Sequence, residues 1–245
     1  MKKLIMANWK MQLNYQASLG LAKKFGQQIK TSAKEVVICP DYLSLVAVSN
    51  TIKKTKLILG AQDCSITERG AYTGEVSPAD LKSLGVRYVI LGHSERRSNW
   101  QENSQMINNK IKAALASKLI PVLCIGETLV EKQRKQTKNV LIRQLRQELK
   151  EVTIKTAQDI VISYEPVWAI STNKAAQPML PSEADEIQEF ISHQAVKILR
   201  KKVRIIYGGS ADFNNASEFL RQKNIAGLLV GGASLKIKNF IEICK

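Results

Sequence analysis

The chain has 245 residues, of which 44% are hydrophobic and 24% charged, and this is enough apolar material for one sizeable core. No apolar run approaches the roughly 20 residues that span a bilayer, so a transmembrane protein is excluded and a single globular domain over residues 1–245 is expected. The 37 Lys and Arg outnumber the 21 Asp and Glu, and the resulting formal charge of +16 favours anionic ligands.

Eight short runs of β-branched or aliphatic residues follow one another, at residues 4–7, 36–39, 57–60, 88–92, 121–126, 160–164, 204–208 and 227–231. Continuous apolar runs of this length are typical of strands buried on both faces. Helical patterns with apolar residues three or four apart lie between them, for example at 103–117, 182–200 and 214–222. This alternation predicts an α/β fold, a (β/α)8 barrel of eight parallel strands with outer helices, rather than an open doubly wound sheet.

Much of the excess positive charge lies in residues 131–150, where Val140, Leu141, Leu145 and Leu149 recur at helical spacing. This spacing favours an amphipathic helix on the outside of the barrel over a binding arm for a polyanion. Aromatic residues make up only 6% of the chain, and no helix-turn-helix or base-stacking motif is present. Specific nucleic-acid recognition is therefore not expected, although weak nonspecific binding stays open.

Polar residues follow several of the expected strands at the point where each strand ends. The first strand leads into Asn8 and Lys10, the fourth into His93 and Glu95, and the sixth into Glu165. Each of them has an ordinary structural explanation when taken alone, such as a surface lysine or an ion-paired carboxylate. Because the carboxyl ends of barrel strands converge on one mouth, together they predict an acid–base site there.

Two glycine-rich turns follow the seventh and eighth strands. The first contains Gly208, Gly209 and Ser210, and the second contains Gly231 and Gly232. One such pair would be consistent with an ordinary turn, because glycine adopts positive φ without strain. Two in succession at this end of a barrel predict a phosphate site, in which backbone N–H groups donate to the oxygens.

The four cysteines, at positions 39, 64, 124 and 244, have neither metal-ligand spacing nor the density of a disulfide scaffold. A reducing compartment, the cytoplasm, is therefore expected. Cys39 and Cys124 lie within apolar runs and should be buried and unreactive. His193 lies in a helical pattern and is expected to be structural.

Seven segments spread over the whole chain resemble the triosephosphate isomerase family. They are ANWKM (7–11), GAYTGEVSP (70–78), VILGHSERR (89–97), CIGET (124–128), YEPVWAI (164–170), YGGS (207–210) and VGGASL (230–235). The resemblance implies a cytoplasmic barrel enzyme of glycolysis and gluconeogenesis, with no metal and no organic cofactor. Its reaction would interconvert dihydroxyacetone phosphate and D-glyceraldehyde 3-phosphate.

The resemblance also implies roles for individual residues. Glu165 would be the base that shuttles one proton between neighbouring carbons through an enediolate. His93 would polarise the substrate carbonyl as a neutral imidazole, as is known for this family. Lys10 would counter the negative charge, Asn8 would hydrogen-bond a substrate oxygen, and Glu95 would orient the catalytic groups. Backbone amides would hold the phosphate, with Asn8 and Lys10 beside it; these amides are those of Ser171, Ser210, Gly231 and Gly232.

Two further segments match family features. Residues 166–176 correspond to a mobile lid that excludes water from the intermediate, but Ser171 and Asn173 stand where the family usually has glycine. A non-glycine residue at positive φ is strained, so lid closure and phosphate affinity are the properties expected to differ here.

The segment that begins at Gln62 and ends at Glu75 corresponds to a loop that docks on a second subunit, with Thr73 near the neighbour's catalytic residues. A homodimer is therefore implied.

Barrel enzymes with other chemistry would need other residues. A metal-using epimerase would need His and carboxylate ligands, and a Schiff-base aldolase would need a lysine inside the barrel; neither pattern is visible. A basic polyanion-binding barrel with absent or secondary isomerase activity remains the alternative from another class.

Positive charge at the mouth could also steer the dianionic substrate. Asp41 replaces a proline common in the family and receives no role.

Overall fold

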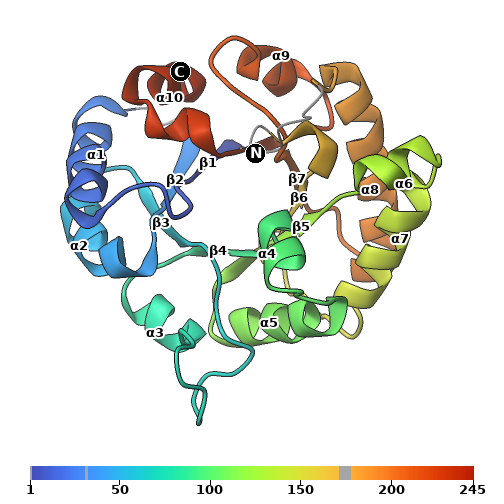
Figure 1. Ribbon diagram of the computed structural model, residues 1–245, viewed down its shortest axis with the longest axis horizontal. Helices are drawn as coiled ribbons and strands as arrows, with labels where there is room; N and C mark the ends of the chain where they lie inside the picture. Colours follow the sequence, from blue (N-terminus) through green and yellow to red (C-terminus); the bar gives the residue numbers. More distant parts are fainter. Residues whose placement is uncertain (1, 31–32, 171–177) are drawn as a thin grey trace.

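The computed structural model describes residues 2–30, 33–170 and 178–245. Eight parallel strands close into a barrel in which each strand pairs with the next and β8 pairs with β1 (Figure 1). The strands are β1 (Lys3–Asn8), β2 (Lys34–Cys39), β3 (Ile58–Ala61), β4 (Tyr88–Leu91), β5 (Ile120–Ile125), β6 (Val161–Tyr164), β7 (Arg204–Tyr207) and β8 (Gly227–Val230). The predicted (β/α)8 barrel is therefore confirmed. Expected runs that ended in Gly92, Gly126, Gly208 or Gly231 stop one residue earlier.

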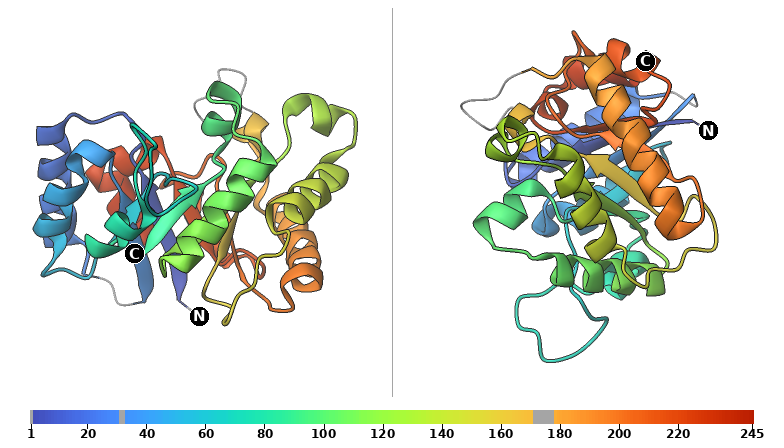
Figure 2. Two further views of the ribbon diagram at one scale, coloured as in Figure 1. Left: turned by 90° about the horizontal axis from the view of Figure 1, so that it is seen from below. Right: turned by 90° about the vertical axis from the view of Figure 1, so that its right-hand side faces the viewer.

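The helices form an outer ring around this barrel (Figure 1), and the side views of Figure 2 show helices on either side of the strands. They are α1 (Tyr15–Gln28), α2 (Tyr42–Ile52), α3 (Pro78–Ser83), α4 (Ser94–Asn99), α5 (Ser104–Ala116), α6 (Leu129–Gln133), α7 (Thr137–Glu148), α8 (Pro181–Leu199), α9 (Ala216–Arg221) and α10 (Ile237–Cys244), with two short 3₁₀ turns, η1 (Val167–Ala169) and η2 (Gly232–Leu235). Within the described residues, no helix is both long and apolar enough to cross a membrane.

The core has two layers because successive strand residues point to opposite faces. Leu4 and Met6 of β1 belong to the cluster inside the barrel, whereas Ile5 and Ala7 pack outward against the helices. Both faces of the sheet are thus covered, which explains why the strands appear in the sequence as unbroken apolar runs.

The expected helix over residues 131–150 is wrong in one respect, because two helices occupy this region. α6 begins with a capping box between Thr128 and Glu131 and ends before Lys135, which adopts a left-handed φ of 57°. α7 then buries Val140, Leu141 and Leu145, so the amphipathic part of the prediction holds. The apolar spacing indicates an amphipathic helix, but the short loop between the two helices contains no glycine or proline that would mark the break.

Asp41 receives a structural explanation. It is the N-cap of α2, where its carboxylate accepts hydrogen bonds from the backbone N–H of Ser44 at 3.0 Å and from the Ser44 hydroxyl at 3.0 Å. An aspartate at this position satisfies a backbone donor that would otherwise have no partner, and its charge interacts favourably with the helix dipole.

Asp41→Ala is therefore expected to lower the free energy of unfolding by about 1 kcal/mol, measured by urea denaturation. Asp41→Asn keeps the acceptor oxygen and should retain most of that stability. An equal loss in both variants would show that the cap does not supply it.

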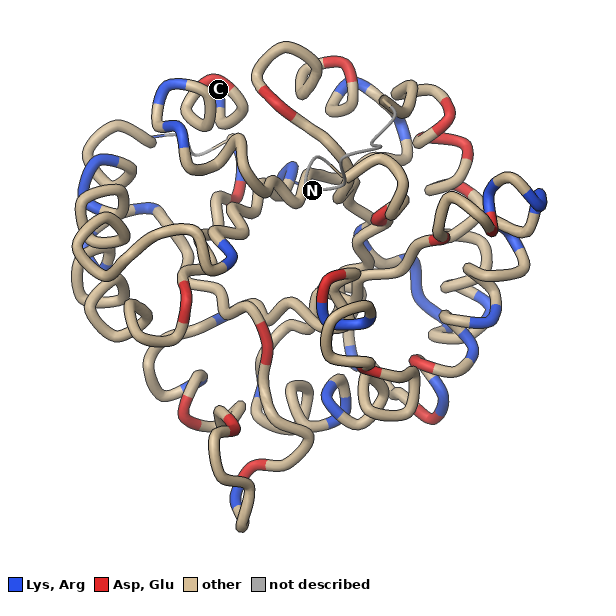
Figure 3. Tube along the Cα trace, in the orientation of Figure 1, with Lys and Arg blue, Asp and Glu red and all other residues tan. Residues whose placement is uncertain are grey.

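Charge is distributed very unevenly between the two ends of the barrel. The helix-to-strand connections and residue 2 form what we call the N-terminal face, and its described residues hold 13 Lys and Arg against two acidic residues, Glu151 and Asp159. The 13 are Lys2, Lys30, Lys53, Lys54, Lys56, Arg87, Lys118, Lys150, Lys155, Arg200, Lys201, Lys202 and Lys223. In Figure 3, basic residues occur on every side of the ring.

The opposite end has the reverse balance. The described strand-to-helix connections, which surround the mouth, contain three basic residues, Lys10, Arg69 and Lys236. They contain seven acidic residues, namely Asp41, Asp63, Glu68, Glu75, Glu127, Glu165 and Asp212. These connections by themselves carry no net positive charge, so they do not add to the argument for substrate steering, which stays a prediction.

Candidate active site

Glu165 follows β6 and is buried, with only 2% of its surface exposed. Its Oε2 accepts a hydrogen bond from the backbone N–H of Ser94 at 3.1 Å, at the N-terminus of α4. Its Oε1 lies 3.5 Å from His93 Nε2 and has no hydrogen-bond partner within the described residues. Oε2 is thus held by a backbone hydrogen bond, while Oε1 is buried, has no hydrogen-bond partner among the described residues and can accept a proton.

His93 is the N-cap of α4 and is 8% exposed. Its Nδ1 accepts a hydrogen bond from the backbone N–H of Glu95 at 3.2 Å. A nitrogen that accepts a hydrogen bond carries no proton, so in the neutral ring the proton is on Nε2. The Nε2–H group is on the side of Glu165, where it can donate to a substrate oxygen.

Lys10 lies between β1 and α1 in a left-handed conformation, with φ of 51°. Its backbone N–H donates to Asn8 Oδ1 at 3.1 Å, and its ammonium Nζ is 2.5 Å from Glu95 Oε1. A lysine at positive φ is strained, so these contacts hold it in a conformation it would not adopt freely. Asn8, Lys10, His93, Glu95 and Glu165 are therefore connected through one chain of contacts.

Gln62 is a positioning residue that the sequence analysis missed. Its Nε2 donates to the carbonyl oxygen of Lys10 at 2.9 Å and to that of Cys39 at 3.0 Å. The side chain thus braces the strained backbone of Lys10 from the end of β3. Nothing in the local sequence pattern indicates this contact, because the two residues are 52 positions apart.

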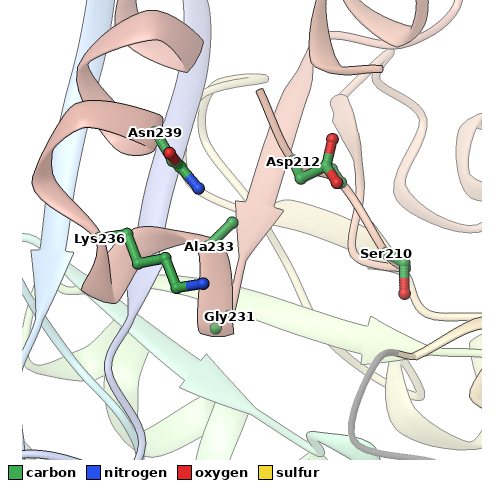
Figure 4. A pocket seen from close by; sticks show the side chains of 9 residues that line it. Ser210, Asp212, Gly231, Ala233, Lys236 and Asn239 are labelled. Atoms are coloured by element: carbon green, nitrogen blue, oxygen red, sulfur yellow. The ribbon is translucent and has the colours of Figure 1, made fainter. Parts of the chain in front are cut away.

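The glycine-rich turns after β7 and β8 line a cavity of about 300 Å³ (Figure 4). Gly209, Ser210, Gly231 and Gly232 contribute to its wall, as do Asp212, Lys236 and Asn239. A side-chain Cβ at Gly231 would lie 3.5 Å from Lys10 Cε, so the cavity adjoins Lys10. Backbone N–H groups at the start of η2 and the Lys236 ammonium suit an anion of phosphate size. Lys236 was not identified from the sequence. Ser171 and Asn173 lie outside the described residues.

A second group near the site involves Glu127, which is 1% exposed. It accepts hydrogen bonds from Trp168 Nε1 at 2.8 Å and from the Tyr164 hydroxyl at 3.2 Å, and burial raises the pKa of its carboxyl group. Lys132 Nζ lies 3.1 Å from the centre of a Trp168 ring. These contacts anchor the first residues after Glu165. The CIGET motif contains Glu127, but the sequence analysis assigned it no role.

The cysteines and the second histidine have no catalytic role assigned to them. Cys39 and Cys124 are buried, as expected, and burial raises the pKa of both thiols. His193 is exposed on α8. Within residues 2–30, 33–170 and 178–245, no group of three or more His, Cys, Asp or Glu side chains is arranged to hold a metal ion.

Comparisons with known proteins give a consistent result. The triosephosphate isomerase family model matches residues 3–245. The triosephosphate isomerase of Dictyoglomus thermophilum is 44% identical over 246 residues, covering 100% of this chain and 99% of that protein. The enzyme of the same name from Carboxydothermus hydrogenoformans is 43% identical, covering 100% and 98%. The crystal structure of triosephosphate isomerase from Bartonella henselae superposes with a TM-score of 0.89 at 34% identity, covering 100% of this chain and 98% of that one.

Proposed function

Because the chain belongs to the triosephosphate isomerase family, an aldose–ketose isomerase family, we propose that it interconverts dihydroxyacetone phosphate and D-glyceraldehyde 3-phosphate. The observation that carries this proposal is the approach of Glu165 Oε1 to His93 Nε2, at 3.5 Å, in a mouth that also contains Lys10 and the glycine-lined cavity. We further place the enzyme in the cytoplasm, as its part in glycolysis and gluconeogenesis implies.

In the proposed mechanism, Glu165 takes a proton from the carbon next to the substrate carbonyl. The electrons of that C–H bond form the carbon–carbon double bond, and the carbonyl oxygen gains the negative charge of an enediolate. His93 Nε2–H donates to this oxygen and the Lys10 ammonium stabilises the charge, which is more effective in a water-poor site than in solvent. After a proton shift between the two oxygens, Glu165 returns its proton to the neighbouring carbon.

Other residues would bind and orient the substrate. The amides of Ser171, Ser210, Gly231 and Gly232 would hold the phosphate, with Lys236 as an additional cation, and Asn8 would contact a substrate oxygen. The contact between Lys10 Nζ and Glu95 Oε1 supports a role for Glu95 in orienting Lys10. Lid closure over residues 166–176, and the effect of Ser171 and Asn173 on it, stay predictions.

The test is an assay of glyceraldehyde 3-phosphate conversion by the purified protein, coupled to reduction of the dihydroxyacetone phosphate formed. The same reaction run in D2O should place deuterium on the carbon that Glu165 reprotonates, because a carboxyl proton exchanges with solvent before its return. A folded protein without turnover, or product without deuterium, would reject the proton-shuttle mechanism.

We also propose that the chain forms a homodimer through residues 62–75. This segment forms most of the loop that projects away from the barrel between β3 and α3 (Figures 1 and 2), and residues 68–75 are all exposed. Large apolar side chains are exposed at Met11 (92%), Leu43 (89%) and Tyr72 (49%). Apolar residues this exposed are typical of a surface that another protein covers, and Met11 directly follows Lys10.

Dilution to the monomer is expected to lower specific activity by about 10²-fold, because Lys10 and His93 lose the neighbouring loop, including Thr73, that keeps them in place. Activity and sedimentation should be measured over the same concentration series. Leu43→Arg should shift both transitions to higher protein concentration, whereas Val196→Arg, an exposed apolar position on α8, should not. Full activity in a demonstrated monomer would contradict the proposal.

A further inference from the structure

The positive charge of the N-terminal face has no role in the proposed reaction. The described part of the N-terminal face contains 13 basic and two acidic residues, whereas the described mouth connections contain three basic and seven acidic residues. A single phosphate site at the mouth needs little of this charge, and charge at the far end of the barrel cannot focus substrate into the mouth. By its charge, this face would suit a larger anion than a single phosphate.

The basic side chains surround the barrel axis instead of converging on one pocket. Lys53, Lys54 and Lys56 precede β3, and Arg200, Lys201 and Lys202 precede β7. These strands are four positions apart in a closed eight-stranded barrel, so the two clusters lie on opposite sides of the face. A single ligand can contact both clusters at the same time only if it is an extended polyanion.

Few of these charges are satisfied within the chain. Within the described residues, Arg87 is the one basic side chain of the face that forms an ion pair, with Glu35 at 3.3 Å. Glu151, one of the two acidic residues of the face, is itself paired with Lys112 of α5 at 3.2 Å. Of the others, Lys30 Nζ and Lys56 Nζ donate to backbone carbonyl oxygens at 3.4 and 3.5 Å, and none pairs with a carboxylate of the described residues. The counterions of these charges would be released when a polyanion binds.

The chemistry of the face favours a phosphate backbone over a lipid surface. The helix-to-strand connections contain no aromatic residue, and their large apolar side chains in the described part of the chain are buried or half-buried, as at Ile29, Leu57 and Val203. Binding to a lipid interface gains much of its strength from inserted apolar side chains, and binding to single strands gains it from stacking on aromatic rings. Phosphate contacts alone are enough for sequence-independent binding to a duplex.

We propose that the N-terminal face is a sequence-independent binding surface for duplex nucleic acid, which contacts the phosphate backbone through the lysine and arginine clusters before β3 and β7. This function is independent of the isomerase reaction, because the face and the mouth are at opposite ends of the barrel.

Two variants with the same change in net charge test the proposal. The face variant carries Lys53→Glu, Lys54→Glu, Lys201→Glu and Lys202→Glu. The matched control carries four substitutions at exposed basic residues in and beside α7: Arg134→Glu, Lys138→Glu, Arg143→Glu and Arg146→Glu. It also tests whether the basic segment 131–150 binds a polyanion. Binding to fluorescent DNA and RNA duplexes of unrelated sequences is measured by anisotropy at two salt concentrations, with vesicles of phosphatidylserine and phosphatidylcholine in parallel.

The wild type is expected to bind all duplexes with similar affinity and to lose affinity steeply with salt. The face variant should bind at least about 10-fold more weakly than the control and show a shallower salt dependence, because fewer phosphates are neutralised. Isomerase activity should be unchanged in both variants, which establishes that they are folded. The proposal is overturned if the wild type does not bind duplexes at low salt, if both variants are weakened equally, or if vesicles are bound and duplexes are not. Binding to only DNA or only RNA would identify which duplex the face takes.

Discussion

Replacing Glu165 with glutamine is expected to lower kcat by about 10³-fold with little change in KM, within the range ascribed to a positioned general base. The amide has nearly the shape of the carboxylate and can still accept the hydrogen bond from the Ser94 backbone, which the structure places at 3.1 Å. It cannot take a proton from carbon at neutral pH. The loss should therefore fall on the chemical step and leave substrate binding largely intact.

Glu218→Gln is the matched control, since it removes one carboxylate from an exposed position on α9. It should retain wild-type kcat. The urea midpoint of Glu165→Gln should stay close to that of the wild type, which separates a lost base from a lost fold. A kcat within tenfold of the wild type in the glutamine variant would show that another group removes the proton.

The largest expected effect on stability comes from Arg97→Met. Arg97 Nη1 lies 2.6 Å from Glu148 Oε1 and Nη2 lies 3.0 Å from Oε2, so the pair is bidentate, and the Glu148 side chain is completely buried. The guanidinium also donates to the carbonyl oxygens of Gly92 and Cys124, each at 2.6 Å. Removal of the cation leaves a buried carboxylate without its counterion, which is expected to lower the free energy of unfolding by about 3–5 kcal/mol.

Urea denaturation at one fixed protein concentration measures this loss, since any dimerisation also contributes to stability. Lys112→Met is the control. Its partner Glu151 is 71% exposed, and removal of a surface pair should cost less than about 1 kcal/mol. The double variant Arg97→Met with Glu148→Gln should recover part of the loss, because no charge is then buried alone. A small effect in Arg97→Met would mean that water or another cation compensates the carboxylate.

Arg97 also connects the stability of the fold to the geometry of the candidate active site. It belongs to α4, whose N-cap is His93 and whose first turn contains Glu95. By bonding to the ends of β4 and β5 through Gly92 and Cys124, the guanidinium holds this helix against the barrel. Any residual folded Arg97→Met protein is therefore expected to have a reduced kcat as well.

Local patterns accounted for much of the architecture. The eight apolar runs all became strands, because strands covered on both faces need no polar residues and leave an unbroken signal. The break between α6 and α7 was missed, since the left-handed Lys135 occupies a conformation for which lysine has no preference. Asp41 shows the opposite case, because the Asp-x-x-Ser spacing is a local signal of its capping role.

The sequence by itself determined the barrel, the strand ends where polar residues gather and, through seven motifs, the family. These features depend on periodicity and residue type within short windows. The tertiary structure alone decided the contacts across the barrel: Gln62 bracing Lys10, Arg97 neutralising Glu148, and the separation of basic and acidic residues to opposite ends. Such contacts join residues tens of positions apart. They depend on how strands and helices close into a ring, and no short-range pattern carries that information.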